Sequence, residues 1–235
     1  MIQYDNYVSV IANSPLFKDT SSEFKRMLFD SMEYKFLPKK TVIDEDDRLQ
    51  WLHLVIGGRI KISQINLLTS KEYIVYLLNP GDVFDVLSFI DQKEHYALFE
   101  ALEDTDVLRI DIVKARELLS VTPEFNKIFL PYLGRRMRFL EENASDLALF
   151  DTVTRLSKLI LRNIDTEDAE NDEIELINNL SQEDIAKMLG SVRTVISRNL
   201  QELKKNQILE TDKGKHKVKD LNALIKQCEH ALIPE

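Results

Sequence analysis

The 235-residue chain has the composition of an ordinary globular protein, with 44% hydrophobic and 30% charged residues and a net charge of −9. It is long enough for one large domain or two modest ones, each with a core of its own. No stretch reaches the ~20 consecutive apolar residues of a membrane-spanning helix, and the N-terminus lacks the basic-then-apolar plan of a secretion signal. We therefore expect a cytoplasmic protein without membrane contact.

The cysteine and histidine content limits the chemistry of the chain. The single cysteine, Cys228, excludes an internal disulfide, a cysteine-based zinc site and a four-thiolate iron–sulfur cluster. The histidines show no metal-binding spacing, so we expect no dedicated metal site; they are His53, His95, His216 and His230. We also find no nucleophile–base pair and no glycine-rich phosphate loop, so we do not expect an enzyme.

The first half of the chain changes from a helical and irregular pattern to a strand pattern near Thr41. Short segments rich in β-branched and aromatic residues follow, and Asp, Asn, Gly or Pro separates many of them. These segments are residues 41–43, 51–56, 59–63, 72–78, 96–102 and 106–110. Their number and spacing predict a β-sandwich or barrel of roughly 70 residues.

After Asp111 the pattern becomes helical. From Tyr132 to Phe150, apolar residues recur at alternating steps of four and three, at Leu133, Met137, Leu140, Ala144 and Leu147. A narrow seam on an otherwise charged helix favours a partner helix and thus a homodimer, while packing on the chain's own β-domain is the alternative. Asp151 then caps a helix that runs to about Asn163, and the acidic stretch 165–172 predicts a solvated loop.

Two consecutive helices are predicted near the C-terminus. Ser181 to Asp184 resembles a capping box, and the helix that follows stops at Gly190, which supplies a left-handed turn conformation. A second helix runs from about Val192 to Lys205, and its apolar side carries Val192, Val195, Ile196, Leu200 and Leu203. The spacing Ala186-x3-Gly190-x5-Ile196 predicts a steeply crossing pair whose free face can enter a major groove, although some helix pairs in proteins that bind no DNA share this spacing.

A basic hairpin is predicted directly after this helix pair. The segment 208–218 forms two short strands around a turn at Asp212-Lys213-Gly214, which is typical of a wing that contacts phosphates. Nine basic residues but only three acidic ones lie from Lys187 to Lys219, on a chain that is acidic elsewhere. This local charge favours double-stranded DNA as the partner.

With these motifs in place, the chain resembles the family of the catabolite activator protein and the fumarate–nitrate reductase regulator. The resemblance runs from Ser14-Pro15-Leu16-Phe17 to the wing, and its signatures are the segments 55–61, 79–84, 147–151 and 190–200. It implies an α+β fold with a cyclic-nucleotide-binding-like β-roll (jelly roll), a long dimerisation helix and a winged helix-turn-helix. We expect these parts at residues 1–122, 123–150 and 151–235. The family also implies a homodimer on an inverted repeat in DNA, with RNA polymerase as a further partner.

The resemblance breaks at the effector pocket. In members that bind cyclic nucleotides, a Gly-Glu pair follows the Pro-Gly-Asp turn, and an Arg followed by Ser or Thr clamps the phosphate. Here Asp85-Val86 and His95-Tyr96 stand at these positions, so the pocket is degenerate. A phosphate that faces Asp85 without a guanidinium would be repelled, and we do not expect cyclic AMP to bind. Haem ligation by His53 or His95 is the alternative; we expect no cofactor, and an unidentified effector or none.

The resemblance also assigns roles within the helix pair and the wing. Arg193, Ser197 and Arg198 match positions that contact bases or phosphates, and Thr194 stands where a glutamate commonly accepts from cytosine N4. We expect these four residues to read bases, and we expect phosphate contacts from Ser181, Ser191, Gln201, Lys204, Lys213 and Lys215. The rival function is a sensor module that acts on a protein partner, which would share the β-roll but would need neither the helix pair nor the wing.

Overall fold

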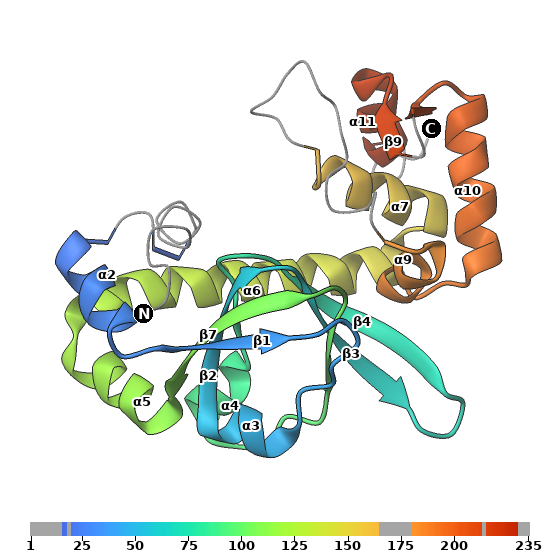
Figure 1. Cartoon of the computed structure of the whole chain (residues 1–235). Helices are drawn as coiled ribbons and strands as arrows, with labels where there is room; N and C mark the ends of the chain where they lie inside the picture. The colour runs from blue at the N-terminus through green and yellow to red at the C-terminus, as the bar shows by residue number, and fades with distance from the viewer. Residues whose placement is uncertain (1–15, 18–19, 165–179, 213–214, 230–235) are drawn as a thin grey trace. The chain divides into compact units, whose positions relative to one another are not determined.

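The structure is a computed structural model that describes residues 16–17, 20–164, 180–212 and 215–229 (Figure 1). The chain divides into two compact units, residues 1–138 and 139–235, which are treated separately below. None of the described helices has the length and apolar character needed to cross a membrane. The predicted acidic loop, the hairpin turn at 213–214, Ser14, Pro15 and His230 lie outside the described residues.

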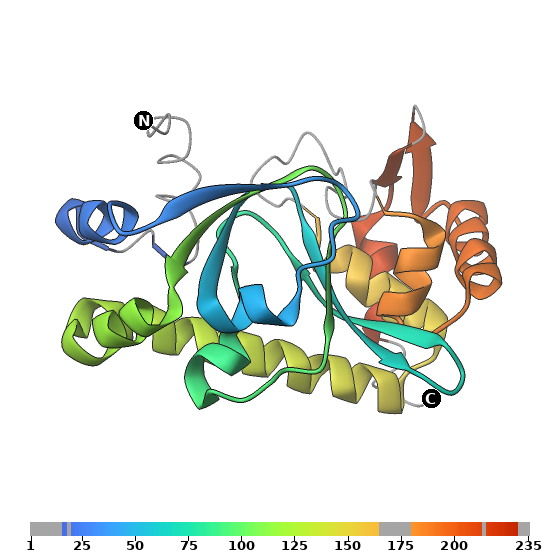
Figure 2. The same cartoon turned by 60° about the horizontal axis from the view of Figure 1, so that its bottom comes forward.

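The first unit contains two antiparallel sheets that wrap around a common core (Figure 2). One sheet has the order β1-β7-β2-β5 and the other β4-β3-β6. The strands are β1 (Glu33–Leu37), β2 (Trp51–Gly57), β3 (Ile60–Asn66), β4 (Lys71–Leu78), β5 (Val83–Phe84), β6 (Leu98–Ala101) and β7 (Thr105–Asp111). This is the predicted β-roll.

Strand β2 shows why the roll forms from this sequence. Successive side chains of a strand point to opposite faces. Leu52, Leu54 and Ile56 pack in a core against helices, whereas Val55 packs in the core inside the roll. Both faces are therefore buried, which explains the nearly continuous apolar run of this segment.

Strand β1 corrects the expectation that the first forty residues are helical and irregular. Glu33–Leu37 pairs antiparallel with the segment 105–109 of β7 and forms an edge of its sheet. Tyr34 and Phe36 are 40% and 48% exposed, so the strand lacks a clean apolar face from which sequence reasoning could have recognised it.

The described residues of this part of the chain form five helices, and each short one begins at a polar cap or directly after a strand. They are α2 (Ser22–Phe29), α3 (Glu45–Gln50), α4 (Val86–Asp91), α5 (Ile112–Val121) and α6 (Pro123–Leu149). Helix α6 is the predicted long helix. Its first half covers the roll through Phe125, Ile128 and Phe129, which share a core with Leu52 and Leu54 of β2.

Two side chains of α6 fix the helix to β5 and to the turn before it. The Tyr132 hydroxyl accepts from the Val83 backbone N–H at 3.1 Å and donates to the Val83 carbonyl at 3.2 Å. Arg136 forms an ion pair with Asp82 at 2.7 Å and lies 4.8 Å from the ring centroid of Tyr76. The rotation of α6 about its own axis is therefore set by the roll.

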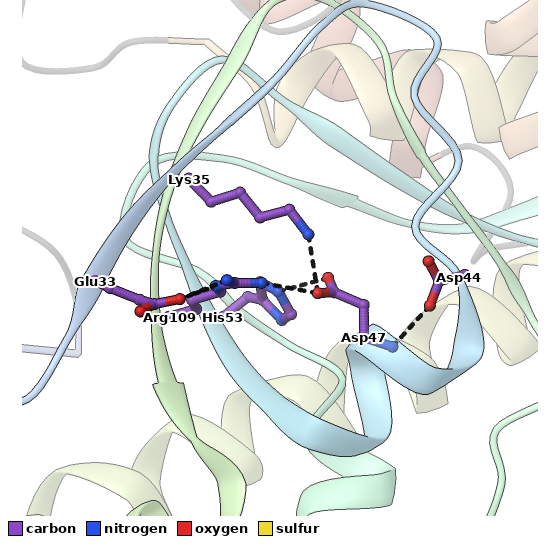
Figure 3. Close-up of polar contacts among 6 residues, drawn as sticks. All are labelled: Glu33, Lys35, Asp44, Asp47, His53 and Arg109. Atoms are coloured by element: carbon purple, nitrogen blue, oxygen red, sulfur yellow. Dashed lines mark hydrogen bonds and ion pairs between the residues drawn. The ribbon is translucent and has the colours of Figure 1, made fainter.

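A polar cluster connects α3 to three strands (Figure 3). The Asp47 carboxylate accepts from Lys35 and Arg109, both at 2.9 Å, and lies 3.1 Å from His53 Nε2. Burial would raise the pKa of the Asp47 carboxyl, but hydrogen bonds with His53 and Lys35 hold that pKa far below its usual value. Burial lowers the pKa of His53 even though Asp47 opposes this shift. At neutral pH the cluster therefore holds an ionised carboxylate against a neutral imidazole.

The second unit contains the C-terminal part of α6 and, after it, a small helical domain with a hairpin (Figure 1). Its elements are α7 (Thr152–Leu161), α9 (Gln182–Met188), α10 (Arg193–Lys205), β8 (Leu209–Asp212), β9 (Lys215–Val218) and α11 (Leu221–Glu229). One core joins all of them, with Leu156, Ile185, Ile196, Leu209 and Leu224 at or below 2% exposure. The predicted helix pair and hairpin are both present.

Candidate functional site

The turn between α9 and α10 has the predicted geometry. Ser181 caps α9: its hydroxyl accepts from the Asp184 backbone N–H at 3.0 Å and donates to the Asp184 carboxylate at 2.6 Å. Gly190 has φ +60°, the left-handed region that favours glycine, and the Ser191 N–H closes the turn on the Ala186 carbonyl at 2.8 Å. The Ser181 hydroxyl is thus engaged in the cap, and its contact with phosphate stays a prediction.

Helix α10 has one buried and one exposed side. Ile196, Leu200 and Leu203 are buried, as predicted, but Val192 is 58% exposed because it is the residue that precedes the helix. Asn199 is buried on the core side, and the apolar pattern gave no sign of it. The opposite side exposes Arg193, Thr194, Arg198 and Gln201, with Ser197 and Lys204 half-buried between them.

We call Arg193, Thr194, Ser197 and Arg198 the reading face. Among the described residues, neither Arg193 nor Arg198 has an ion pair or a hydrogen-bonding side chain of the protein as partner. Lys187, by contrast, is paired with Glu183 at 3.1 Å. The two guanidinium groups are therefore open to a ligand, and arginine can pair bidentately with the O6 and N7 of guanine.

The hairpin β8–β9 lies beside α10 and carries further positive charge (Figure 2). Its strands pair from Leu209 with Val218 to Asp212 with Lys215. Lys215 is exposed, whereas Lys213 lies outside the described residues. Burial and the positive charge of Lys204 in α10 lower the pKa of His216.

The end of α6 is attached to α7 by a buried carboxylate. Asp146 is 7% exposed, pairs with Arg162 at 2.8 Å and contacts Lys158. One residue further, the Leu147 side chain lies against the helix-turn-helix: a Cβ on Gly190 would stand 3.0 Å from Leu147 Cδ2. Leu147 is predicted for the dimer seam and also belongs to the segment 147–151 that resembles the family, and here it contacts the helix-turn-helix.

The rest of the predicted seam is exposed in the single chain. Met137, Leu140 and Leu147 are 70%, 41% and 39% exposed, and Ala144 is exposed as well. Leu133 instead packs partly against the core beneath the roll. Leu130, which is 62% exposed, continues the same steps of three and four towards the N-terminus. We call Leu130, Met137, Leu140, Ala144 and Leu147 the dimer stripe.

At the predicted effector pocket, Asp85 is buried and paired. Its carboxylate accepts from Arg48 Nη1 at 2.8 Å and from the Ser88 hydroxyl at 2.9 Å, and it lies 2.7 Å from His95 Nδ1. The expectation that no guanidinium faces Asp85 is therefore wrong, because α3 brings Arg48 to it from 37 residues away. Tyr96 is not part of this group: it is 77% exposed and contacts Glu94.

Two protein families match the chain, one after the other. The cyclic nucleotide-binding domain matches residues 33–121, and the Crp-like helix-turn-helix domain matches residues 154–227. The chain belongs to the Crp/Fnr family. This confirms the predicted α+β fold with its β-roll and helix-turn-helix, and the prediction of a transcription regulator rather than an enzyme.

Individual relatives are distant but cover most of the chain. The CRP-like cAMP-activated global transcriptional regulator of Mycobacterium tuberculosis (strain CDC 1551 / Oshkosh) is 25% identical over 163 residues, 68% of this chain and 71% of that protein. The cAMP-activated global transcriptional regulator CRP of Salmonella typhimurium is 23% identical over 177 residues, 75% of this chain and 84% of that protein.

Solved structures share the fold at similar distances. FixK2 from Bradyrhizobium japonicum has a TM-score of 0.71 at 18% identity and covers 83% of this chain and 96% of its own. A CooA variant from Carboxydothermus hydrogenoformans has a TM-score of 0.71 at 23% identity and covers 88% and 95%. At these identities the likeness establishes the architecture alone.

A cyclic nucleotide, the ligand implied by the Crp/Fnr roll, does not fit the residues present here. Asp85, whose carboxyl pKa is lowered, places a buried negative charge in the roll, and Arg48 is already paired with it. Val86 packs partly against the core outside the roll, and an apolar side chain cannot hold a ribose hydroxyl. The described residues include no group of three or more side chains that could hold a metal ion. The two histidines that could ligate haem each lie against a carboxylate: His53 contacts Asp47, and His95 contacts Asp85.

Replacement of Gly190 in the turn of this Crp/Fnr helix pair tests whether the backbone conformation or the contact with Leu147 requires glycine there. We expect Gly190→Ala to lower the free energy of unfolding by about 1–2 kcal/mol, because alanine is strained in the left-handed region. Urea denaturation followed by circular dichroism measures the change. Gly190→Asn brings the same Cβ against Leu147 but tolerates this backbone conformation, so its loss should be smaller. Equal losses would mean that the Leu147 contact, rather than the backbone, requires glycine.

Proposed function

We propose that the chain is a sequence-specific DNA-binding regulator that binds an inverted repeat as a homodimer and needs no cyclic nucleotide. The observation that carries this proposal is the reading face, on which Arg193 and Arg198 are exposed and unpaired next to a basic hairpin. Base contacts from these residues, and phosphate contacts from Ser181, Ser191, Gln201, Lys204, Lys213 and Lys215, are part of the proposal.

The homodimer follows from the dimer stripe. An isolated chain would leave Met137 and Leu140 in water, whereas a second copy of α6 can cover them in a two-fold seam. A two-fold dimer presents two copies of α10 to successive major grooves, about 34 Å apart, and this geometry demands an inverted repeat.

The functional division that we propose is an effector-type domain at residues 1–122, a dimerisation helix at 123–150 and a DNA-binding domain at 151–235. The boundary between the compact units, at residue 138, falls within that helix. In this arrangement the protein acts in the cytoplasm with RNA polymerase as a further partner. A module that acts only on a protein partner would leave the reading face without a role.

Selection of bound DNA from a random library tests the proposal directly. We expect the enriched sequences to contain two inverted half-sites whose centres are about one helical turn, 10–10.5 base pairs, apart. The selection is performed without added ligand, because the proposal is that DNA binding needs no cyclic nucleotide. A protein that enriches no sequence, or only single unpaired half-sites, would contradict the proposal of a sequence-specific dimer.

A further inference from the structure

The carboxylate of Asp85 is surrounded by hydrogen-bond donors on several sides. Arg48, Ser88 and His95 supply these donors, and the Asp85 side chain is 1% exposed. Burial would raise the pKa of the Asp85 carboxyl, but the hydrogen bond with His95, the Ser88 hydroxyl and the charge of Arg48 lower it below its usual value. Because an ionised carboxylate only accepts, the hydrogen at Nδ1 of His95 points towards it. The Asp85 carboxylate is thus a buried anion whose hydrogen-bond donors come from three side chains.

The two nitrogen donors are held in place by contacts other than those with Asp85. The Arg48 guanidinium lies 4.3 Å from the ring centroid of Phe99 and also donates to the His95 carbonyl at 3.2 Å. The His95 ring meets the same Phe99 ring edge-on, with 5.5 Å between centroids. The side chains of Arg48 and His95 therefore both pack on the Phe99 ring, which holds them next to each other.

Arg48 also has more donor capacity than Asp85 uses. Its Nε is buried and has no hydrogen-bond partner, while Asp85 accepts from Nη1. A guanidinium binds a planar carboxylate best through two parallel N–H groups, from Nη1 and Nη2 or from Nη2 and Nε, and Asp85 accepts from Nη1 alone. The N–H groups of Arg48 can therefore bind an anion, and Asp85 accepts from only some of them.

We infer that the β-roll contains a site for a small anion of the carboxylate type, and that Asp85 occupies this site from within the chain. Removal of the side chain would leave a cationic pocket, lined by Arg48, Ser88 and His95, that can take a free carboxylate. This inference concerns the roll alone and does not depend on DNA binding.

Chemical rescue of Asp85→Ala tests the inference. In chloride buffer the melting temperature of the full-length variant should fall by roughly 5–15 °C, because removal of Asp85 leaves the buried Arg48 guanidinium uncompensated. Sodium formate, the smallest carboxylate, should then raise the melting temperature relative to equal concentrations of sodium chloride. The increase should follow the logarithm of formate concentration above its dissociation constant, as mass action requires.

Two control variants test whether formate acts at the site that the Asp85 side chain leaves empty. Asp85→Asn fills the same space with a neutral amide, so formate should have no more effect on it than chloride. The double variant Arg48→Met, Asp85→Ala lacks the main cation and should also fail to respond. Equal melting temperatures of Asp85→Ala in formate and chloride would overturn the inference, as would an equal response of Asp85→Asn. If Asp85→Ala does not fold in chloride, its refolding yield is compared in formate and in chloride. A higher yield in formate supports the inference, and equal yields contradict it.

Discussion

A variant that carries Met137→Glu and Leu140→Glu is expected to sediment as a monomer and to lose tight binding to the selected DNA. Both side chains are exposed in the single chain, and each would be buried twice in a two-fold dimer. Burial of one such side chain contributes about 1.5–3 kcal/mol, and the substitution also places charges in the seam. Sedimentation velocity measures the first effect.

The loss of DNA affinity should be large because a monomer holds only one half-site. Two linked half-sites bind about 10²–10⁴ times more tightly than one, and this factor disappears in the monomer. The double variant Val113→Glu, Val121→Glu is the matched control, since both valines are exposed and apolar but lie on α5, away from the dimer stripe. A seam variant that still sediments as a dimer would contradict the assignment of this interface.

Arg193→Ala is expected to weaken binding to the selected site by about 5–150-fold, or 1–3 kcal/mol, and to leave binding to scrambled DNA largely unchanged. The reason is that Arg193 is exposed at the start of α10, the part of a recognition helix that reaches base edges. Fluorescence anisotropy with both DNAs at two salt concentrations measures the difference. Preference should relax at one guanine in each half-site.

Two further variants separate base reading from charge. Arg193→Lys keeps the charge but loses the bidentate fork, so it should lose most of the discrimination and little of the non-specific affinity. Lys215→Ala, on the wing, should weaken both DNAs alike and flatten the salt dependence by about one unit per phosphate contact. If Arg193→Ala also weakens both DNAs alike, Arg193 contacts only phosphate.

The DNA-binding unit could be predicted from sequence because its determinants are local. The cap at Ser181, the glycine turn and the amphipathic α10 all depend on residues three or four apart or on one residue's backbone conformation. These short-range signals survive when the three-dimensional arrangement is unknown. Even there, the buried Asn199 was missed, because a polar side chain interrupts the pattern that identifies a core face.

The roll interior could not be predicted in the same way. Arg48 and Asp85 meet across 37 residues, and the buried contact between them has no local signal in either segment. Nothing in the segment around Arg48 distinguishes its arginine from one on a solvated helix. The predicted seam also begins too late in the helix: it starts at Leu133, whereas α6 already begins at Pro123 and exposes Leu130 one step earlier.

The two attachments of α6 have a mechanical consequence. Tyr132 and Arg136 fasten the helix to the roll, and Asp146 fastens it to α7. Between them lies the segment 137–145, about two and a half turns of uninterrupted helix. A glycine or proline introduced into this segment would weaken or break the helix between its two attachments, whereas one introduced at Phe150 lies where the helix has already ended.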